Sequence, residues 1–195
     1  MKPLTAYVWD SFPPERDFGY EKREGLLFVG GFAHPPNLDA VLWFLKEVFP
    51  RVRAEEPVNF YVAGSKVPDE LKALDNPAAG IHILGFVSDE RLAELYQSCR
   101  LVVVPLRYGA GVKGKVIEAL YYGAPVLTTP IGAEGIPDAA QVMEIREDAA
   151  DFAAETLRLY RDRDALTAMA ERAARYIRAH NSMDAVWAEL KDDFA

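Results

Sequence analysis

The stretch that decides the fold runs from residue 101 to residue 136 and reads LVVVPLRYGAGVKGKVIEALYYGAPVLTTPIGAEGI. It opens with an apolar, β-branched run, Leu101 to Val104, which is too short for a helix and is typical of a buried strand. A glycine-rich loop follows, and then a segment with helical spacing of apolar residues that ends at Gly123. A second buried strand runs from Pro125 to Thr129. This strand, loop, helix and strand unit predicts a parallel sheet with a right-handed crossover.

The loop after the first of these strands carries the features of an anion site. Gly109 and Gly111 let the backbone approach a ligand closely. The N-terminus of the helix that follows offers unpaired N–H groups and a partial positive charge, which suit phosphate. Lys113 and Lys115 stand at that terminus and add positive charge. Because ligands of parallel sheets bind outside the carboxyl ends of the strands, we expect the site there.

Glu118 extends this pattern from phosphate to nucleotide. It follows Lys115 by three residues, so both side chains share one face of the predicted helix. A carboxylate would repel a phosphate that it touched, but it can accept hydrogen bonds from both hydroxyls of a sugar diol. We therefore expect the diphosphate to bind to the loop and the two lysines. We expect the ribose to bind to Glu118. The alternative is a surface ion pair worth about 0.2–0.5 kcal/mol, with glycines that serve the turn only.

The segment KGKVIEALYYGAPVLTTPIGAEGI resembles the donor-site segment of bacterial family 4 glycosyltransferases, which have the GT-B fold. Those enzymes carry a helix reading roughly E-A-x-x-x-G-x-P-V, then a strand and a glycine-rich turn. The matching residues here are Glu118, Ala119, Gly123, Pro125 and Val126, followed by Gly132. The resemblance implies that Glu118 holds the donor ribose.

The chain also departs from the family pattern at two places. Relatives commonly carry a glutamate eight residues before the one matched by Glu118, and Ala110 stands there. A branch of the family that reads G-x-G-x-K-x-K in this loop fits better. Many relatives hold the diphosphate with a basic pair after the first strand, but no Lys or Arg lies between Gly30 and Asn37. We therefore expect Lys113 and Lys115 to stabilise the leaving diphosphate, and we name no catalytic base.

Three other segments supply candidate donor contacts. A first strand at Leu26 to Gly30 ends in Gly30 and Gly31, where a ligand could approach the backbone. This turn lacks the G-x-G-x-x-G dinucleotide fingerprint. Phe86 and Val87 follow a third strand at 81–84, and the resemblance places this G-F-V turn beside the nucleobase. Arg107 can pair with the diphosphate or with a nearby carboxylate.

Two further residues have competing interpretations. His34 is either a solvated loop side chain or a neighbour of the donor phosphate. Cys99 lies on the apolar side of a predicted helix next to a buried strand, which favours a place in the core over a nucleophile.

Together these patterns predict an α/β fold, a Rossmann-like doubly wound sheet of about six parallel strands like the C-terminal half of GT-B enzymes. Further strands are expected at 58–63 and 142–145, with helices from 149 onward. Residues 1–24 form a lead-in or linker, and residues 25–195 form a nucleotide-sugar-binding domain with C-terminal helices. The lead-in has four aromatic residues that pack on the domain or on a missing neighbour: Trp9, Phe12, Phe18 and Tyr20.

Bulk properties narrow the class of protein. The 195 residues suffice for one α/β domain, and the net charge of −8 argues against a nucleic-acid or anionic-membrane surface. The single cysteine, Cys99, forbids an internal disulfide, and the chain shows neither a signal pattern nor a transmembrane run, so we expect a cytoplasmic protein. No His/Cys cluster has metal-ligand spacing, and no cofactor besides the donor is expected.

The resemblance implies transfer of a sugar, of hexosyl type and with retention, from a nucleotide-diphosphate-sugar in polysaccharide biosynthesis. A complete GT-B enzyme has two such domains, with the acceptor on the N-terminal one. We therefore expect this chain to be the donor-binding half of a larger enzyme and to be weak or inactive alone. The alternatives are a non-catalytic nucleotide-binding or interaction domain that kept the fold, and half of a GT-B sugar-nucleotide epimerase.

Overall fold

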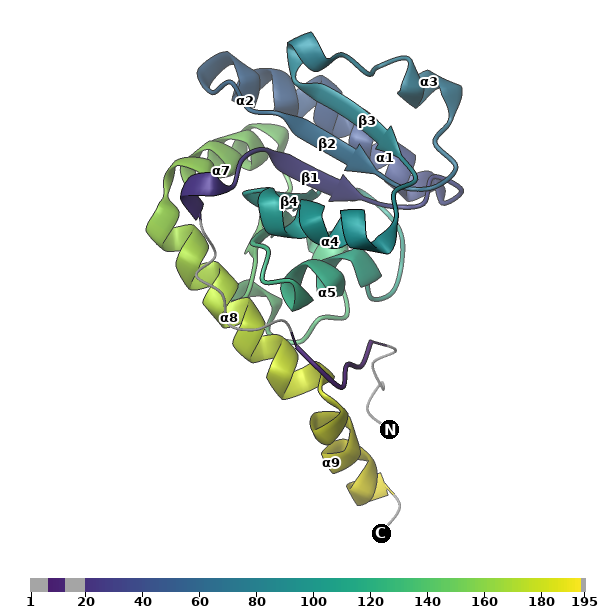
Figure 1. Ribbon diagram of the computed structural model, residues 1–195, viewed down its shortest axis with the longest axis vertical. Coiled ribbons are helices and arrows are strands. Elements are labelled where there is room, and N and C mark those ends of the chain that lie inside the picture. The colour runs from purple at the N-terminus through teal and green to yellow at the C-terminus, as the bar shows by residue number, and fades with distance from the viewer. Residues whose placement is uncertain (1–6, 13–19, 194–195) are drawn as a thin grey trace.

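The computed structural model describes residues 7–12 and 20–193, and all six described strands form one parallel sheet (Figure 1). Its strand order is β3-β2-β1-β4-β5-β6. The strands are β1 Leu26–Val29, β2 Phe60–Ala63, β3 Ile81–Gly85, β4 Leu101–Val104, β5 Val126–Thr128 and β6 Glu144–Ile145. Each lies within or next to a stretch predicted to be a strand, so the predicted α/β sheet of parallel strands is confirmed.

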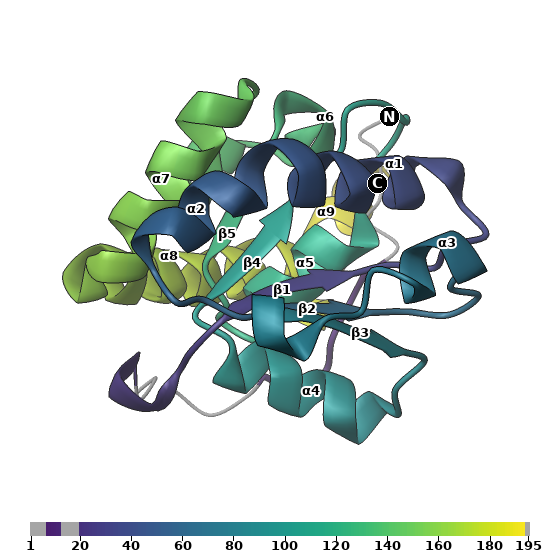
Figure 2. The same ribbon diagram turned by 90° about the horizontal axis from the view of Figure 1, so that it is seen from above.

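Helices cover both faces of this sheet. They are α1 Pro35–Trp43, α2 Phe49–Glu55, α3 Asp69–Lys72, α4 Asp89–Ser98, α5 Gly114–Tyr121, α6 Pro130–Ala133, α7 Ala149–Arg161, α8 Arg163–Asn181 and α9 Met183–Asp193. Helices α1 and α2 lie on one face and α4 on the other (Figures 1 and 2). Right-handed crossovers produce this arrangement, because the chain crosses the sheet in one direction from β1 to β3 and in the opposite direction from β3 to β6. Within the described helices, none combines the length and apolar character needed to cross a membrane.

The core is built from strands that are buried on both faces, as parallel sheets require. All four residues of β4 are buried, which explains their unbroken apolar run. Aromatic rings join the sheet to the helices above it: the Phe44 and Phe60 ring centroids lie 4.7 Å apart, and Phe152 of α7 meets Phe44 edge-on at 6.0 Å.

Helix α1 begins at Pro35, and its helical course continues into α2. Residues Phe44–Val48 form a π-helical turn that joins α1 to α2. Pro50 lies directly beyond this turn and has no N–H to donate to the preceding turn, so a wider turn accommodates its ring. Pro50 thus changes the type of helix without ending the helix. The spacing of apolar residues does not indicate this change.

The stretch after β5 was predicted to be a glycine-rich loop, and this prediction is wrong in part. Pro130–Ala133 form the short helix α6, with Pro130 in its first turn. Thr129 caps this helix, because its hydroxyl oxygen accepts a hydrogen bond from the Gly132 amide at 3.2 Å. A threonine followed by proline is a helix-start signal that the two nearby glycines obscured.

Aromatic residues of the lead-in pack on this domain. Tyr20 is buried, and its hydroxyl donates a hydrogen bond to the Leu166 carbonyl oxygen at 2.8 Å. Trp9 and Phe12 are partly buried against the core. Phe18 lies outside the described residues.

The turns after β1 and β2 touch so closely that one of them requires a glycine. A Cβ added to Gly64 would lie 1.8 Å from the carbonyl oxygen of Gly30. The Gly30 amide also donates to the Ala63 carbonyl oxygen at 3.0 Å. The backbone of β2 therefore fixes the position of the turn that follows β1.

We expect Gly64→Ala to lower the free energy of unfolding by about 3 kcal/mol or more, because a methyl group would meet backbone that cannot move away alone. Urea unfolding monitored by circular dichroism measures this change. The matched control is Gly31→Ala, whose Cβ would have the Ser65 hydroxyl oxygen at 3.3 Å as its nearest neighbour. Equal stability of the two variants would contradict the close contact.

Candidate functional site

The candidate site lies at the carboxyl ends of β1 and β4, two strands that are neighbours in the sheet. The chain leaves β1 toward one edge of the sheet and leaves β4 toward the other edge. Ligands of such sheets bind where this reversal separates the loop after β1 from the loop after β4, and we call the region between these two loops the crevice. The two glycine-containing loops singled out in the sequence both border this crevice.

Lys115, in the first turn of α5, reaches across the crevice to α1. Its Nζ donates a hydrogen bond to Oδ1 of Asn37 and lies 4.4 Å from the centroid of the Phe28 ring. Asn37 is buried, and its amide nitrogen donates to the Gly31 carbonyl oxygen at 2.8 Å. Lys115, Asn37 and Gly31 therefore form one chain of hydrogen bonds that joins α5 to the turn after β1.

This location changes the acidity of the lysine. Burial disfavours the charged ammonium and lowers the pKa of Lys115 to about 7. The neighbouring Glu118 carboxylate opposes this change, and Lys113 adds to it. A group that titrates near neutral pH and lies at the edge of a crevice is a candidate functional residue on physical grounds.

Gly30 provides the room for the Lys115 ammonium group. A Cβ on Gly30 would lie 2.7 Å from Lys115 Nζ and 2.9 Å from Asn37 Cγ. The absence of a side chain at Gly30 therefore leaves the space that the ammonium group of a lysine from another helix occupies.

Lys113 stands at the N-cap position of α5 and turns to the other side. Its ammonium donates to the Gly111 carbonyl oxygen and lies 3.2 Å from Oε2 of Glu134. Only 10% of its side chain is exposed, compared with 48% for Glu134. The two lysines thus flank the first turn of α5, and each has a partner on a different loop.

Arg107 makes a second bridge over the crevice. Its Nε donates to Oδ2 of Asp39 at 2.9 Å, and its Nη2 donates to Oδ1 of the same carboxylate. The hydrogen bond to Asp39 raises the pKa of the guanidinium group. Of the two roles proposed for Arg107 from the sequence, the structure shows the pairing with a carboxylate.

Glu118 lies one helical turn beyond Gly114 and is partly buried. The hydroxyl of Tyr96, a fully buried residue of α4, donates to Glu118 Oε2 at 3.3 Å. Burial raises the pKa of Glu118, and burial also raises the pKa of Tyr96, so the phenol keeps the proton that it donates. The Tyr96 hydroxyl fixes one carboxylate oxygen of Glu118.

The loop between β4 and α5 has left-handed backbone at two glycines, with φ of +118° at Gly109 and +80° at Gly111. In the described part of the chain, apart from Gly111 and its two chain neighbours, no heavy atom lies within 4 Å of the position that a Cβ on Gly111 would take. Backbone conformation therefore requires glycine at Gly111, and the space beside it is open to a ligand.

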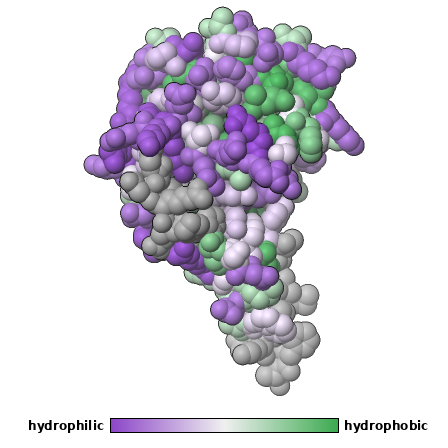
Figure 3. All heavy atoms as spheres, in the orientation of Figure 1, coloured by the Kyte–Doolittle hydropathy of each residue, from purple (hydrophilic) through white to green (hydrophobic). Residues whose placement is uncertain are grey.

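Phe86 and Val87 follow β3 directly, at the same carboxyl edge of the sheet. The Phe86 side chain is 79% exposed, whereas Val87 packs partly against the core. Leu74 and Leu84 are also exposed. Figure 3, in the orientation of Figure 1, shows a hydrophobic area over the part of the molecule where β3 and α3 lie. The exposed Phe86 ring is available to a flat ligand. It follows β3, whereas Glu118 lies on α5.

His34 and Cys99, for which the sequence allowed two interpretations each, lie in different surroundings. His34 is exposed at the N-cap position of α1, on the turn after β1. Cys99 lies in the core, and burial raises the pKa of its thiol to about 12, which rules out a thiolate at neutral pH. In residues 7–12 and 20–193, no three His, Cys, Asp or Glu side chains gather in a way that could hold a metal ion.

Comparison with known proteins gives the family. The sequence pattern of the family described as Glycosyl transferases group 1 matches residues 23–162, which is more than half of the chain. The chain belongs to this family. An uncharacterized 44.6 kDa protein in the cps region of Klebsiella pneumoniae is 32% identical over 140 residues, covering 66% of this chain and 36% of the relative.

Solved structures of glycosyltransferases share the fold. A variant of S. aureus TarM, crystallised with fondaparinux, alpha-GlcNAc-glycerol and UDP, superposes with a TM-score of 0.73 at 16% identity. That match covers 97% of this chain and 38% of TarM. The C-terminal domain of LpcC, a glycosyl transferase group 1 protein from Francisella tularensis, gives a TM-score of 0.68 at 17% identity and covers 88% and 96% of the two chains. The domain therefore has the GT-B Rossmann-like fold, and the chain spans less than half of the longer relatives.

Sequence reasoning missed the partners of the site's charged groups in this glycosyltransferase domain. Asn37, Asp39 and Tyr96 each contact a predicted site residue from an element far away in the chain. Thr129 was also missed, although its hydroxyl donates to the Leu106 carbonyl oxygen and so ties the loop after β5 to the loop after β4. Only the threonine had a local signal, because it precedes Pro130.

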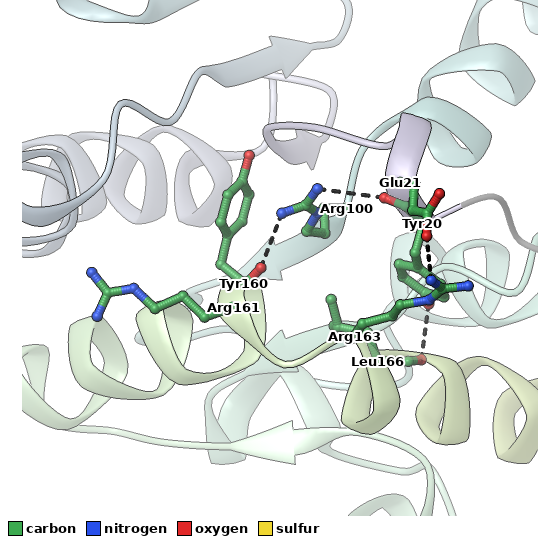
Figure 4. A pocket seen from close by; sticks show the side chains of 7 residues that line it. All are labelled: Tyr20, Glu21, Arg100, Tyr160, Arg161, Arg163 and Leu166. Atoms are coloured by element: carbon green, nitrogen blue, oxygen red, sulfur yellow. Dashed lines mark hydrogen bonds and ion pairs between the residues drawn. The ribbon is translucent and has the colours of Figure 1, made fainter.

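A separate cavity of about 120 Å³ lies at the opposite end of the sheet (Figure 4). It borders the amino end of β4, where Arg100 donates to the carbonyl oxygens of Arg23, Tyr160 and Tyr20. Arg163 pairs there with Glu21. These contacts hold the chain before β1 against the turn between α7 and α8. Arg100 and Arg163, which line the cavity, therefore have structural partners.

The burial of Lys115 predicts a pH-dependent stability. Between pH 7 and its ordinary pKa of 10.5, the unfolded chain binds a proton at this lysine and the folded chain has lost it. The free energy of unfolding of the wild type relative to Lys115→Met should therefore rise with pH in this range, by at most about 1.4 kcal/mol per pH unit.

Urea unfolding of both proteins at pH 6.5, 7.5, 8.5 and 9.5 measures this difference. Methionine preserves the length and apolar stem of the side chain and does not titrate. A difference that stays constant or falls as pH rises would show that Lys115 is not held in an environment that disfavours its charge.

Proposed function

We propose that this chain binds the nucleotide-diphosphate-sugar donor of a retaining glycosyltransferase of hexosyl type. The observation that carries the proposal is the arrangement on α5: two lysines flank its N-terminus, and Glu118 lies one turn further on. The turn after β1 lies opposite across the crevice. Family membership and the UDP in the crystallised TarM variant support a nucleotide donor.

The proposed binding mode divides the donor along this helix. The diphosphate lies at the N-terminus of α5, between its amides and the ammonium groups of Lys113 and Lys115. The ribose hydroxyls donate to the free oxygen of Glu118, whose other oxygen accepts from Tyr96. The base lies toward Phe86 and Val87. Gly30, Gly31, Gly109 and Gly111 let the backbone approach the phosphates and the sugar.

In this scheme the chemistry that this chain supplies is electrostatic. As the bond between the sugar and the diphosphate breaks, negative charge develops on the leaving phosphate oxygen. Fixed positive groups stabilise that charge in the transition state. A dianion beside Lys115 raises the pKa of its ammonium group above the value of about 7 in the free protein, so the lysine is charged when it is needed.

Arg107 could contact the diphosphate only by leaving its present partner, Asp39. Its guanidinium group is held by Asp39 in a two-point contact, and a diphosphate would have to compete with that carboxylate. We therefore propose that Arg107 stays with Asp39 and joins the loop after β4 to α1 at the rim of the crevice.

The acceptor is proposed to bind on a second domain, because complete GT-B enzymes place it on an N-terminal half. The relatives are long enough to contain such a domain, since this chain covers 36% of the Klebsiella relative and 38% of TarM. The cps-region relative supports a role in polysaccharide biosynthesis.

A non-catalytic nucleotide-binding or interaction domain is the second candidate. Ala110, exposed on the loop after β4, favours it, because relatives commonly have a glutamate that contacts the transferred sugar there. A donor domain and a non-catalytic nucleotide-binding domain both keep a nucleotide site, whereas an interaction domain remodelled for a partner does not. Nucleotide binding therefore separates the first two from an interaction domain.

Calorimetric titration of the chain with UDP, GDP, ADP and their sugar conjugates tests the site. We expect one nucleotide to bind, and Glu118→Gln to raise its dissociation constant about tenfold or more, because hydrogen bonds to a charged carboxylate contribute about 1.5–3 kcal/mol. Glutamine can still accept from Tyr96, so the fold is preserved.

Glu94→Gln is the matched control, since Glu94 is an exposed residue of α4 that pairs with Arg91. It should bind like the wild type. Equal affinity of Glu118→Gln and the wild type would refute the assignment of the ribose to Glu118. Absence of binding by every nucleotide would favour the interaction domain.

A further inference from the structure

The N-terminal segment Tyr7–Phe12 lies against the helix that carries the proposed donor site. It is fastened at the junction of α8 and α9, where the Trp9 amide donates to the Asn181 carbonyl oxygen at 3.0 Å and the Met183 amide donates to the Trp9 carbonyl oxygen at 3.3 Å (Figure 1). The buried Asn181 side chain also donates to the Tyr7 carbonyl oxygen at 2.8 Å. The backbone of this segment is thus held at several points.

Side chains of the segment cover the C-terminal end of α5. The rings of Trp9 and Tyr121 stack with their centroids 4.3 Å apart. The Tyr121 hydroxyl donates to the Ser11 carbonyl oxygen at 3.1 Å, and the Phe12 ring centroid lies 6.0 Å from that of Tyr121. These contacts join the segment to the last turn of the helix.

Tyr7 reaches the other end of the same helix. A Cβ on Gly114, the first residue of α5, would lie 1.9 Å from the Tyr7 hydroxyl oxygen and 2.6 Å from the Tyr7 Cζ. Gly114 is helical, so its backbone would accept an alanine. An alanine at this position would therefore require the Tyr7 ring to move, because the ring occupies the space of a side chain.

The place of this contact connects it to the proposed donor site. Residues 114 and 118 are one helical turn apart and share a face of α5, so Tyr7 lies on the face that carries Glu118. Lys113 and Lys115 flank Gly114 in the sequence. The Tyr7 ring consequently packs on the one turn of helix from which both lysines extend.

We propose that Tyr7 is a positioning residue for the donor site: its ring fills the space of the absent side chain at Gly114 and fixes the first turn of α5, and with it Lys113 and Lys115. This inference rests on the proposed function. It makes Tyr7 part of the nucleotide site, so that displacement of its ring from Gly114 changes donor affinity.

A double-mutant cycle tests this proposal on the full chain with UDP as the probe. We expect Tyr7→Ala and Gly114→Ala each to raise the dissociation constant about tenfold, by removing the packing or by forcing the ring away. The double variant should bind more tightly than Gly114→Ala alone, because the new methyl group enters space that the ring has left.

Tyr121→Phe is the control, because it removes the hydrogen bond to Ser11 at the far end of α5 and should leave the dissociation constant within about twofold. Circular dichroism identifies the variants that fold, and Tyr7→Ala decides alone if Gly114→Ala does not. Dissociation constants like that of the wild type for Tyr7→Ala and Gly114→Ala, while Glu118→Gln has lost binding, would overturn this inference and leave the proposed function standing. Effects of the two substitutions that simply multiply, or an equal effect of Tyr121→Phe, would also overturn it. If the wild type binds no nucleotide, both fall together.

Discussion

The ammonium group of one partly buried lysine, Lys115, joins the two halves of this sheet. Lys115 extends from α5 on one side of the crevice to Asn37 of α1 on the other, and Asn37 in turn holds the Gly31 carbonyl oxygen. Burial of a lysine costs free energy, and an amide oxygen and the face of Phe28 offset part of that cost. The turn after β1 and the first turn of α5 therefore cannot move independently of one another.

This constraint brings a positive group to a turn that has no Lys or Arg of its own between Gly30 and Asn37. Positive charge at that turn comes instead from α5, and Gly30 is the opening through which the Lys115 ammonium reaches it. Lys113 is held on the opposite side by Glu134, and Tyr96 orients Glu118 one turn below. In the account proposed here, one short helix carries both the charge that binds a diphosphate and the carboxylate that binds a ribose.

The sheet and the candidate residues of α5 could be predicted from the sequence, because both depend on local patterns. These patterns are apolar runs such as 101–104 and the spacing of lysine, glycine and glutamate residues. The sequence was not sufficient to predict the partners of these residues. Lys115 and Asn37 are 78 positions apart, and Arg107 and Asp39 are 68 positions apart, so no local pattern connects them. Gly114 stands between Lys113 and Lys115, and no local pattern shows that Tyr7, more than a hundred residues earlier, occupies the space that a side chain would take there. The π-helical turn before Pro50 was missed for a different reason, since apolar spacing does not report helix type.

The central claim is that a nucleotide diphosphate binds at the N-terminus of α5 and across the crevice on the turn after β1. The most direct measurement is a titration of the ¹⁵N-labelled chain with UDP, followed by the amide chemical shifts in NMR spectra, which detects weak as well as tight binding. The account predicts that the largest changes occur at Gly30, Gly31, Gly114 and Lys115. Changes centred instead on the cavity at Tyr20, Arg100 and Arg163, or no changes at millimolar UDP, would contradict it.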